Sequence, residues 1–277
     1  MRKLRITICS VALLALAAST HAEGFTLTGS QHLDVTTSYD YGYLYESSTA
    51  SILTGGNVLT TLFVNDEAKL NISYGSANML HTYNNSTLDM SGGNISNYLS
   101  SLDSSTVNIS NASVVNWLYA TNTSTVNISG GTFTHQSYAY NNSIMNISGG
   151  IFNDAFTAYN DSKINFSGGN MINSLRAIDS SVVNISGGTI VSLHANNTSN
   201  VIFEGYDFIL GQGLSWDIDG QTILGTGTLT GKWFNNTSFV IPIQYHDTTA
   251  TIMAIPEPAT LALLSLASLV MIKKRKA

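Results

Sequence analysis

The stretch "STVNISGG" at 124–131 decides the fold, because nearly the same phrase recurs along the chain. It is followed by "SIMNISGG" at 143–150, "SKINFSGG" at 162–169 and "SVVNISGG" at 181–188. The apolar residue in the middle of each phrase marks a longer series: Leu53, Ile72, Met90, Ile109, Ile128, Ile147, Phe166, Ile185 and Phe203. The numbers of successive markers differ by 18 or 19, and Val35 marks an earlier and poorer copy at the same interval before Leu53. A fixed period of this length predicts a solenoid.

Each copy has the pattern of short strands rather than of a helix. Val126 and Ile128 alternate with Asn127 and Ser129, which places the apolar pair on one face of a strand. The following Gly-Gly pair ends the strand, because glycine adopts positive φ angles. An apolar residue and a second alternating run come next. Each run ends on a residue type that favours turns, namely Asn122, Asn141, Asn160 or Asp179.

Strands that repeat without intervening helices predict an all-β, single-stranded parallel β-helix of nine or ten coils. Equivalent residues then stack about 4.8 Å apart along a rod. Two interior ladders are expected, one through Val107, Val126, Met145, Ile164 and Val183, and one through Ile109, Ile128, Ile147, Phe166 and Ile185. Between them, a ladder of side-chain amides faces outward: Asn108, Asn127, Asn146, Asn165 and Asn184. We interpret the amide ladder as structural, with ligand binding as the alternative.

The first 22 residues predict a secretory signal peptide. They combine a basic start, an apolar run from Ile6 to Ala18 and small residues near Ala22. Cys9, the chain's one cysteine, lies inside this segment, so the mature protein has no disulfide. The predicted organisation is therefore a signal peptide at 1–22, β-helix repeats at 23–207, a C-terminal β cap at 208–254 and a sorting segment at 255–277.

The C-terminal segment reads "IPEPATLALLSLASLVMIKKRKA". Pro256, Glu257 and Pro258 precede an apolar stretch at 259–272, and a basic tail follows at 273–276. The apolar stretch is short for a bilayer, which needs about 20 residues. The basic tail would remain on the cytoplasmic side.

This order of motif, apolar stretch and basic tail closely resembles the PEP-CTERM sorting signal of Gram-negative bacteria. The resemblance implies processing by an exosortase that recognises Pro256, Glu257 and Pro258. It also implies transient membrane anchoring through 259–272, followed by transfer to the envelope surface or the extracellular matrix.

The rod resembles the 19-residue repeats of autotransporter adhesins, but its C-terminal part differs from theirs. A transmembrane barrel needs at least eight strands of about 9–11 residues, and the segment 208–254 is too short to supply them. This segment loses the period of the repeats, so we interpret it as the cap that a solenoid requires.

Charge argues against a nucleic-acid partner. Between Glu23 and Pro258 the chain has four basic residues against 17 acidic ones, a formal charge of 4 minus 17, or −13. Such a surface repels phosphate backbones.

Many parallel β-helices cleave polysaccharides, which makes an enzyme the alternative class. Glycoside cleavage by hydrolysis needs two carboxyl groups that face one bond, and no equivalent strand positions here stack carboxylates on neighbouring coils. The acidic residues are interpreted as turn residues: Asp89, Asp103, Asp154, Asp161 and Asp179, with Asp217 and Asp219 in the cap. The histidines have no metal-ligand spacing, and the glycines form no nucleotide-binding loop. We therefore predict no enzyme activity, no metal and no cofactor, and keep a polysaccharide lyase or hydrolase as the alternative.

One outward feature points to a ligand. Tyr119 and Tyr138 occupy the same repeat position on neighbouring coils, and Tyr140 and Tyr159 repeat in the same way. Such pairs either stabilise the sheet by cross-strand contact or form a carbohydrate-contacting patch. The sequence as a whole predicts a secreted, surface-anchored structural or adhesive protein of a bacterial envelope or exopolysaccharide matrix.

Overall fold

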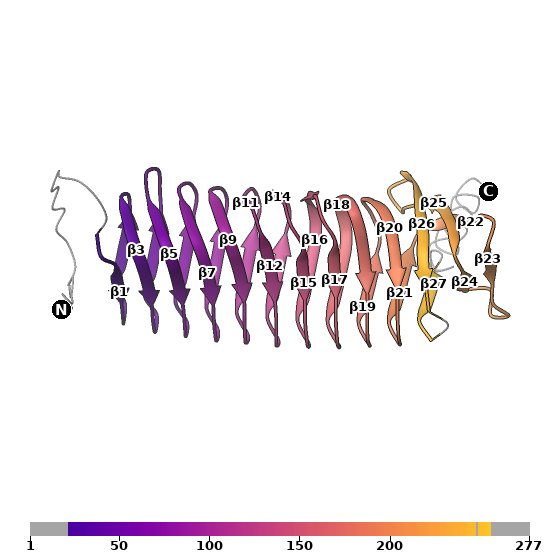
Figure 1. Cartoon of the computed structure of the whole chain (residues 1–277), viewed down its shortest axis with the longest axis horizontal. Helices are drawn as coiled ribbons and strands as arrows, with labels where there is room; N and C mark the ends of the chain where they lie inside the picture. The colour runs from indigo at the N-terminus through magenta and orange to yellow at the C-terminus, as the bar shows by residue number, and fades with distance from the viewer. Residues whose placement is uncertain (1–21, 248, 256–277) are drawn as a thin grey trace, which may run out of the picture.

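The computed structural model describes residues 22–247 and 249–255, which form one elongated rod of stacked strands (Figure 1). The described residues contain no helix. The strands stack as a parallel β-solenoid of about nine turns with about 19 residues each, which confirms the predicted fold class. Residues 1–21 and 256–277 lie outside the described part, so the signal peptide up to 21, Pro256, Glu257, Pro258 and the apolar stretch 259–272 lie there too.

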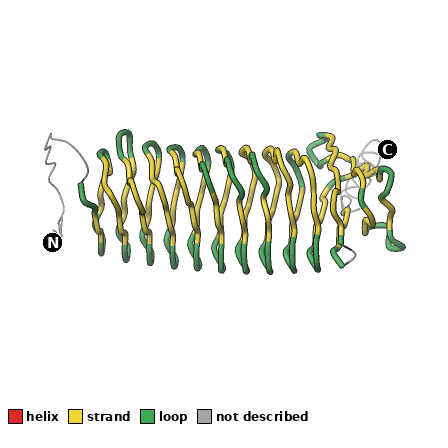
Figure 2. The backbone as a smooth tube through the Cα atoms, viewed as in Figure 1, coloured by secondary structure: helices red, strands yellow, loops and turns green. Residues whose placement is uncertain are grey.

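One long face of the rod is built from the strand that contains the recurring phrase. Figure 2 shows these strands aligned from coil to coil, with turns at the edges of the rod. The strands of this face are β2 (His32–Val35), β4 (Thr49–Ile52), β6 (Lys69–Ile72), β8 (Thr87–Met90), β10 (Thr106–Ile109), β13 (Thr125–Ile128), the starts of β16 (Ile144–Phe152) and β18 (Lys163–Ala177), β19 (Val182–Ile185), β21 (Asn200–Glu204) and β27 (Thr251–Ile255).

The other faces are built from the returning strands of each coil. They are β1 (Phe25–Leu27), β3 (Ser38–Leu44), β5 (Asn57–Val64), β7 (Ser76–Thr82), β9 (Asn94–Ser101), β11 (Ser113–Val114), β12 (Trp117–Ala120), β14 (Thr132–Phe133), β15 (Ser137–Ala139), β17 (Phe156–Ala158), β20 (Thr189–Ala195), β26 (Ser238–His246) and the ends of β16 and β18. β18 passes through its glycine turn without interruption, so one strand covers most of a coil.

The interior consists of the predicted apolar ladders. Ile109 pairs with Ile128, and Ile128 pairs with Ile147, in parallel register. All three are 1% exposed, and Val107 and Val126 beside them are fully buried. Burying one such side chain stabilises the fold by about 1.5–3 kcal/mol. The interior side chains of a single coil are open toward the coils above and below it. They are covered only when coils stack.

The register corrects one marker of the sequence series. Ile52, not Leu53, pairs with Ile72, and Val35 pairs with Ile52. Ile52 is fully buried, whereas Leu53 is partly exposed. The coil from Ile52 to Ile72 holds one residue more than the period because β5 has a bulge around Leu59, which is 37% exposed. The prediction was wrong by one position because the extra residue lies away from the recurring phrase.

At one edge of the rod the coils turn on an Asn, Asp or Glu with positive φ. Asn122, Asn141 and Asn160 have φ between 56° and 59°, and Asp179 has 61°. These left-handed angles are unfavourable for most residues and are tolerated by Asn and Asp, so the predicted turns are confirmed. Their side chains bond from coil to coil, as Asn122 Nδ2 does to Asp103 Oδ1 at 3.0 Å.

At the glycine edge, coils approach too closely for a side chain. A Cβ atom on Gly130 would lie 2.2 Å from the Ser110 carbonyl oxygen, and Gly131 has a φ of 106°. The Gly-Gly pair is therefore required by space as well as by backbone angle. Phe133, which follows soon after, turns inward and stacks on Phe152 at a centroid distance of 4.8 Å.

A row of buried serines lines the inside of the Asn edge, and it was not predicted. Ser124 Oγ accepts a hydrogen bond from the Thr121 N–H at 3.1 Å and donates to the Ser101 carbonyl oxygen at 2.9 Å. The buried serines of this row are Ser48, Ser86, Ser105, Ser124, Ser143, Ser162, Ser181 and Ser199. Four of them begin the quoted phrases, so the recurrence of Ser at that position was the available signal.

The cap segment forms antiparallel strand pairs and also adds a last coil to the rod. Two antiparallel pairs form, one of β22 (Tyr206–Leu210) with β25 (Gly227–Lys232) and one of β23 (Leu214–Trp216) with β24 (Thr222–Gly225). The chain then returns to the rod, where β26 pairs in parallel with β20 and β27 with β21, which adds one more coil. Because β25 pairs with β26 and β24 with β27, the last coil is not left as an open edge, and β22 and β23 become the outermost strands.

Candidate functional site

The four candidate tyrosines come together on the outward face of the returning strands. β12 and β15 place Tyr119 beside Tyr138, with ring centroids 5.4 Å apart and planes at 12°. Tyr140 and Tyr159 stack at 5.0 Å and 8°, and Tyr138 contacts Tyr140 at 5.7 Å. Their inward neighbours, Leu118 and Ala120 among them, are fully buried. The predicted outward direction is therefore correct.

The ring orientation limits how these tyrosines could contact a ligand. Because neighbouring rings lie nearly parallel at about 5 Å, each ring covers part of the face of the next one. All four side chains are half-buried. Ring edges and hydroxyl groups, rather than free ring faces, are what this patch offers to solvent.

Burial favours the protonated form of three of the four phenols. Desolvation by burial raises the pKa of Tyr140 to about 12, and the neighbouring tyrosines act in the same direction. Burial likewise raises the pKa of Tyr119 and of Tyr138. The hydroxyl groups of these three residues are thus neutral hydrogen-bond donors and acceptors at physiological pH.

The aromatic surface is longer than the sequence predicted. Toward the N-terminus the tyrosines continue into Tyr98 and Trp117, which stack at 5.1 Å. Further along, Phe63 stacks between Tyr43 at 5.1 Å and His81 at 5.3 Å. Burial lowers the pKa of His81. Tyr43, Phe63 and His81 were missed because the aromatic type changes and because Ser100 interrupts their series before Tyr119. Tyr98 and Trp117 were missed because they lie two residues earlier in the repeat.

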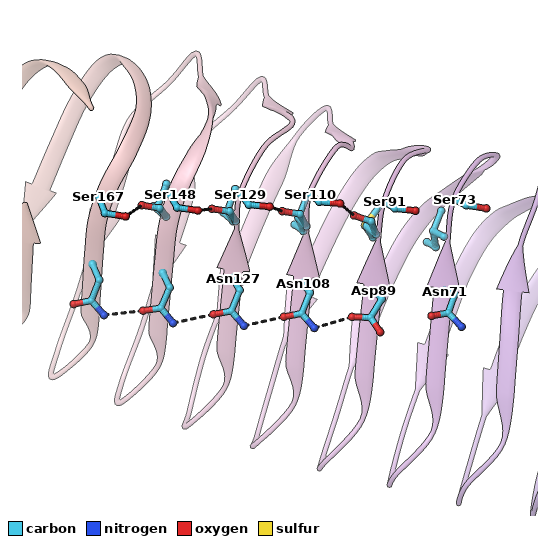
Figure 3. A pocket seen from close by; sticks show the side chains of 17 residues that line it. Asn71, Ser73, Asp89, Ser91, Asn108, Ser110, Asn127, Ser129, Ser148 and Ser167 are labelled. Carbon is cyan, nitrogen blue, oxygen red and sulfur yellow. Dashed lines mark hydrogen bonds between the residues drawn. The ribbon is translucent and has the colours of Figure 1, made fainter. Parts of the chain in front are cut away.

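A groove runs along the face that carries the recurring phrase (Figure 3), with a volume of about 610 Å³. Its outward lining has two rows, the amide ladder and a row of serines two residues further along each strand. The inward-pointing residue between them, such as Ile128, also lines it. The first row comprises Asn71, Asp89, Asn108, Asn127, Asn146 and Asn165, and the second Ser73, Ser91, Ser110, Ser129, Ser148 and Ser167.

The amide ladder is bonded along its length, which supports the structural interpretation. Asn127 Nδ2 donates to Asn108 Oδ1 at 2.8 Å, and Asn146 Nδ2 donates to Asn127 Oδ1 at 2.8 Å. The series continues through Asn165 and Asn184 at 2.7 and 2.9 Å. Such a ladder uses one N–H and one oxygen lone pair of each amide, and an amide has two of each.

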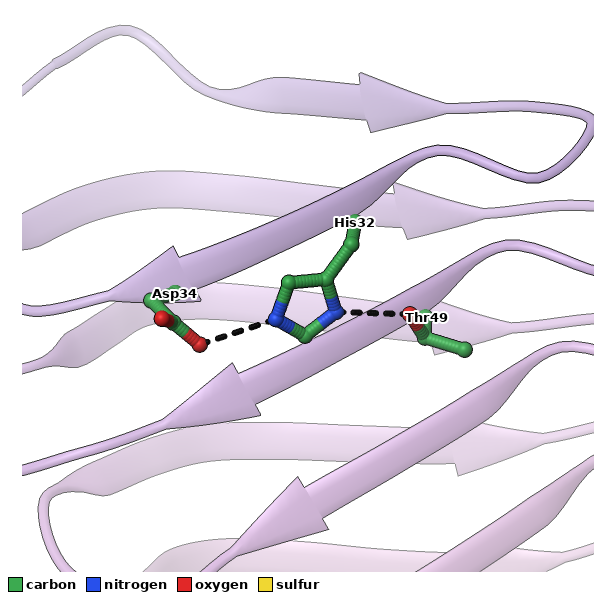
Figure 4. A network of polar contacts seen from close by, with 3 residues as sticks. All are labelled: His32, Asp34 and Thr49. Atoms are coloured by element: carbon green, nitrogen blue, oxygen red, sulfur yellow. Dashed lines mark hydrogen bonds and ion pairs between the residues drawn. The ribbon is translucent and has the colours of Figure 1, made fainter. Parts of the chain in front are cut away.

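A separate polar network lies near the N-terminal end of the rod (Figure 4). His32 Nε2 contacts Asp34 Oδ1 at 2.9 Å, and His32 Nδ1 contacts Thr49 Oγ1 at 2.6 Å. β2 places His32 and Asp34 on one face, and β4 supplies Thr49 as the direct partner of His32. A histidine between a carboxylate and a hydroxyl is a known means of activating the hydroxyl. Here the side chains of His32 and Asp34 are 50% and 56% exposed and lie outside the groove, so water screens their interaction.

Six of the seven carboxylates considered for catalysis accept hydrogen bonds within turns or ladders. Asp103 and Asp179 accept hydrogen bonds from turn residues of neighbouring coils, and Asp154 accepts one from Asn173 Nδ2 at 3.2 Å. Asp219 accepts from the N–H groups of Gln221 and Thr222 within its own turn, and these bonds lower its pKa. Among the described residues, no group of three or more His, Cys, Asp and Glu side chains could hold a metal ion.

Comparison with known proteins gives no relative from which a site could be transferred: no protein-family model, curated protein or solved structure matches the chain. Within 22–247 and 249–255 there is also no helix long and apolar enough to span a membrane.

Proposed function

We propose that the protein is a secreted, non-enzymatic rod that acts as a structural or adhesive component of a bacterial envelope or exopolysaccharide matrix. The observation that carries the proposal is the continuity of the bonded ladders. Asn127 bonds to its equivalents on both neighbouring coils, and Asn122 of the turn ladder bonds to Asp103 and Asn141 in the same way. The outward side chains of these ladders bond to one another between coils and stabilise a long, continuous surface. Such a surface favours a mechanical or adhesive role.

The route to the surface is proposed from the ends of the chain. The signal peptide at 1–22 directs export, and the PEP-CTERM-like segment directs exosortase processing at Pro256, Glu257 and Pro258. The stretch 259–272 holds the protein in the membrane until it is processed. The formal charge of −13 between 23 and 258 suits an extracellular surface and disfavours nucleic acid.

The proposed adhesive contact is the tyrosine patch. Neutral phenol hydroxyls and ring edges can bond to the hydroxyl groups of an exopolysaccharide, and each such contact is weak. Many rods fixed on one surface would gain by avidity.

Two variants test the proposal in the native organism. Replacing Pro256, Glu257 and Pro258 with alanine should leave the protein in the membrane fraction, whereas wild-type surface protein should lack 273–276 by intact mass. Recovery of surface protein with its full C-terminus would contradict the sorting part.

The adhesive part is tested by retention of protein-coated beads on the organism's own exopolysaccharide. Replacing the four tyrosines with phenylalanine keeps the stacked rings and removes the hydroxyls, so a folded variant should be retained less than wild type. Equal retention would contradict a role for the hydroxyls. The matched control is Tyr74→Phe, because Tyr74 is 63% exposed and lies outside this patch.

A further inference from the structure

The groove beside the amide ladder has features of a binding site that the tyrosine patch lacks. It extends over the coils from Asn71 to Ser167, and its serines at 110, 129, 148 and 167 are exposed. With coils about 4.8 Å apart, its six equivalent positions span about 24 Å along the rod. Such a site is long, narrow and open, and it suits a polymer lying parallel to the rod axis better than a compact small molecule.

The groove offers the same polar groups at every coil. Asn127 and Asn146 each keep one N–H and one oxygen lone pair after the ladder bonds are made. The serine hydroxyls donate to carbonyl oxygens of the preceding coil, but Ser129 Oγ lies 3.4 Å from the Ile109 oxygen and Ser148 Oγ 3.4 Å from the Ile128 oxygen. These bonds are longer than the usual O–H···O distance of about 2.7–2.8 Å. The hydroxyls can therefore turn toward a ligand at little cost.

Charge and backbone pairing restrict the class of polymer. Asp89 is the one ionisable side chain in the groove lining, so nothing there attracts an anionic chain. A peptide that adds as a strand needs a free sheet edge, and β10 and β13 are paired on both edges. Neutral sugars, by contrast, carry hydroxyl groups that match amide N–H, amide oxygen and serine hydroxyl groups.

We infer that this groove binds one extended chain of a neutral polysaccharide along the rod axis, through the Asn108–Asn127–Asn146 ladder and the serine row beside it. The inference deepens the proposed function and rests on it for the biological source of the polymer. The tyrosine patch would then make weak additional contacts with the matrix. The groove would be the main binding site, in which the polymer is held by polar groups repeated at the spacing of the coils.

The test uses the full-length protein in mild detergent and a panel of neutral gluco-, manno- and galacto-oligosaccharides of two to ten units. Calorimetry should show an affinity for at least one series that rises with chain length until the oligomer covers about 24 Å. Oligomers of uronic acids should bind at least tenfold more weakly than the best neutral series.

Substitutions that fill the groove locate the site. Ser110→Tyr together with Ser148→Tyr should weaken binding at least tenfold, because both side chains point outward and leave the amide ladder intact. Thr123→Tyr together with Asn142→Tyr is the matched control at exposed turn positions and should change affinity less than twofold. Ser129→Tyr alone is the second variant, for the case in which circular dichroism shows that the double variant is misfolded.

Two results would overturn the inference: absence of binding to every neutral series, or equal affinity of the folded groove variants and wild type. Neither result would affect the proposed function if the protein were still processed, displayed on the surface and retained on the native matrix. Conversely, failure of sorting or retention would contradict the proposed function. The groove would still be tested independently by oligosaccharide binding to the purified protein.

Discussion

Replacing Ile128 with alanine should destabilise the rod strongly, because this side chain fills the centre of an interior ladder. Ile128 is 1% exposed and lies between Ile109 and Ile147, which are equally buried. Each contact of a solenoid coil is with its two neighbours. The space left by the deletion can therefore be filled only by small shifts in those two coils, which the hydrogen-bonded ladders resist.

The loss in free energy of unfolding can be estimated from the atoms that Ile128→Ala removes. Isoleucine to alanine removes three carbon atoms, worth about 0.8 kcal/mol each in lost burial. A remaining cavity of about 50 Å³ adds about 1.2 kcal/mol at about 24 cal/mol per Å³. The expected loss in free energy of unfolding is therefore about 3–4 kcal/mol. Ile128→Asp should cost more, because it also places an unpaired carboxylate in the core.

The assay is urea unfolding of the purified protein followed by circular dichroism. Ile144→Ala is the matched control, because Ile144 lies on the next coil, points outward and is 36% exposed. It should cost about 1.5 kcal/mol or less, since about two thirds of this side chain is buried and its removal leaves no enclosed cavity. The reasoning would be refuted if Ile128→Ala unfolded like the parent, or if the two variants were destabilised equally.

Three further predictions concern the ladders and turns. Asn127→Ala removes both of its ladder bonds and should cost about 1–3 kcal/mol by urea unfolding, whereas Asn142→Ala, at an exposed turn position, should cost less than about 0.5 kcal/mol. Asn141 has a φ of 58°, so Asn141→Val should lower the melting temperature more than Asn141→Gly; the reverse order would be incompatible with a left-handed turn. Because the folded state raises the pKa of Tyr140 to about 12, its phenol should leave stability unaffected below pH 10 and reduce it as the pH rises from 10 to 12. Tyr140→Phe should make melting less pH-dependent in that window, and an unchanged alkaline profile would count against this assignment.

The fold could be predicted because the interior and the turns repeat in one phase. Val126 and Ile128 indicate the inward face of their copy, and Asn122 indicates a turn that is then found with a φ of 59°. The amide ladder was also predicted, since residues at one repeat position must stack when strands pair in register. In a solenoid, residues at the same position of successive repeats are in contact, so the sequence pattern also predicts the tertiary contacts. Most folds lack this relation.

The errors and omissions arise where the role of a residue is not determined by its position in the 19-residue repeat. The bulge at Leu59 shifts one coil, so that Ile52 rather than Leu53 joins the interior ladder. Ser124 looked like an ordinary polar residue beside the strand, although it is buried and satisfies backbone groups of two coils. The return of β26 to the rod could not be predicted, because no spacing relates Leu193 to its partner Ile243.

The candidate site was predicted in part. The outward direction and contact of the four tyrosines are correct, but their mutual stacking depends on side-chain rotation, which the repeat position leaves free. The groove was not predicted, because the repeat pattern gives the direction of the side chains but not the curvature of the surface that they line. Whether either surface binds a sugar stays a prediction.

The late return of the chain to the rod also imposes an order on folding. Ordinary coils, with about 19 residues each, can close one after another as the chain emerges. Phe203, however, must wait for Ala254 as its partner, and the whole antiparallel cap lies between them. By loop-closure entropy alone this closure costs about 0.9 kcal/mol more than that of an ordinary coil.

The antiparallel hairpin of β25 and β26 shortens the search, since it can form first and deliver β26 to β20. A chain that folds from its N-terminus would therefore keep its last coil open until the cap has formed, so completion of the rod requires the residues up to Ile255.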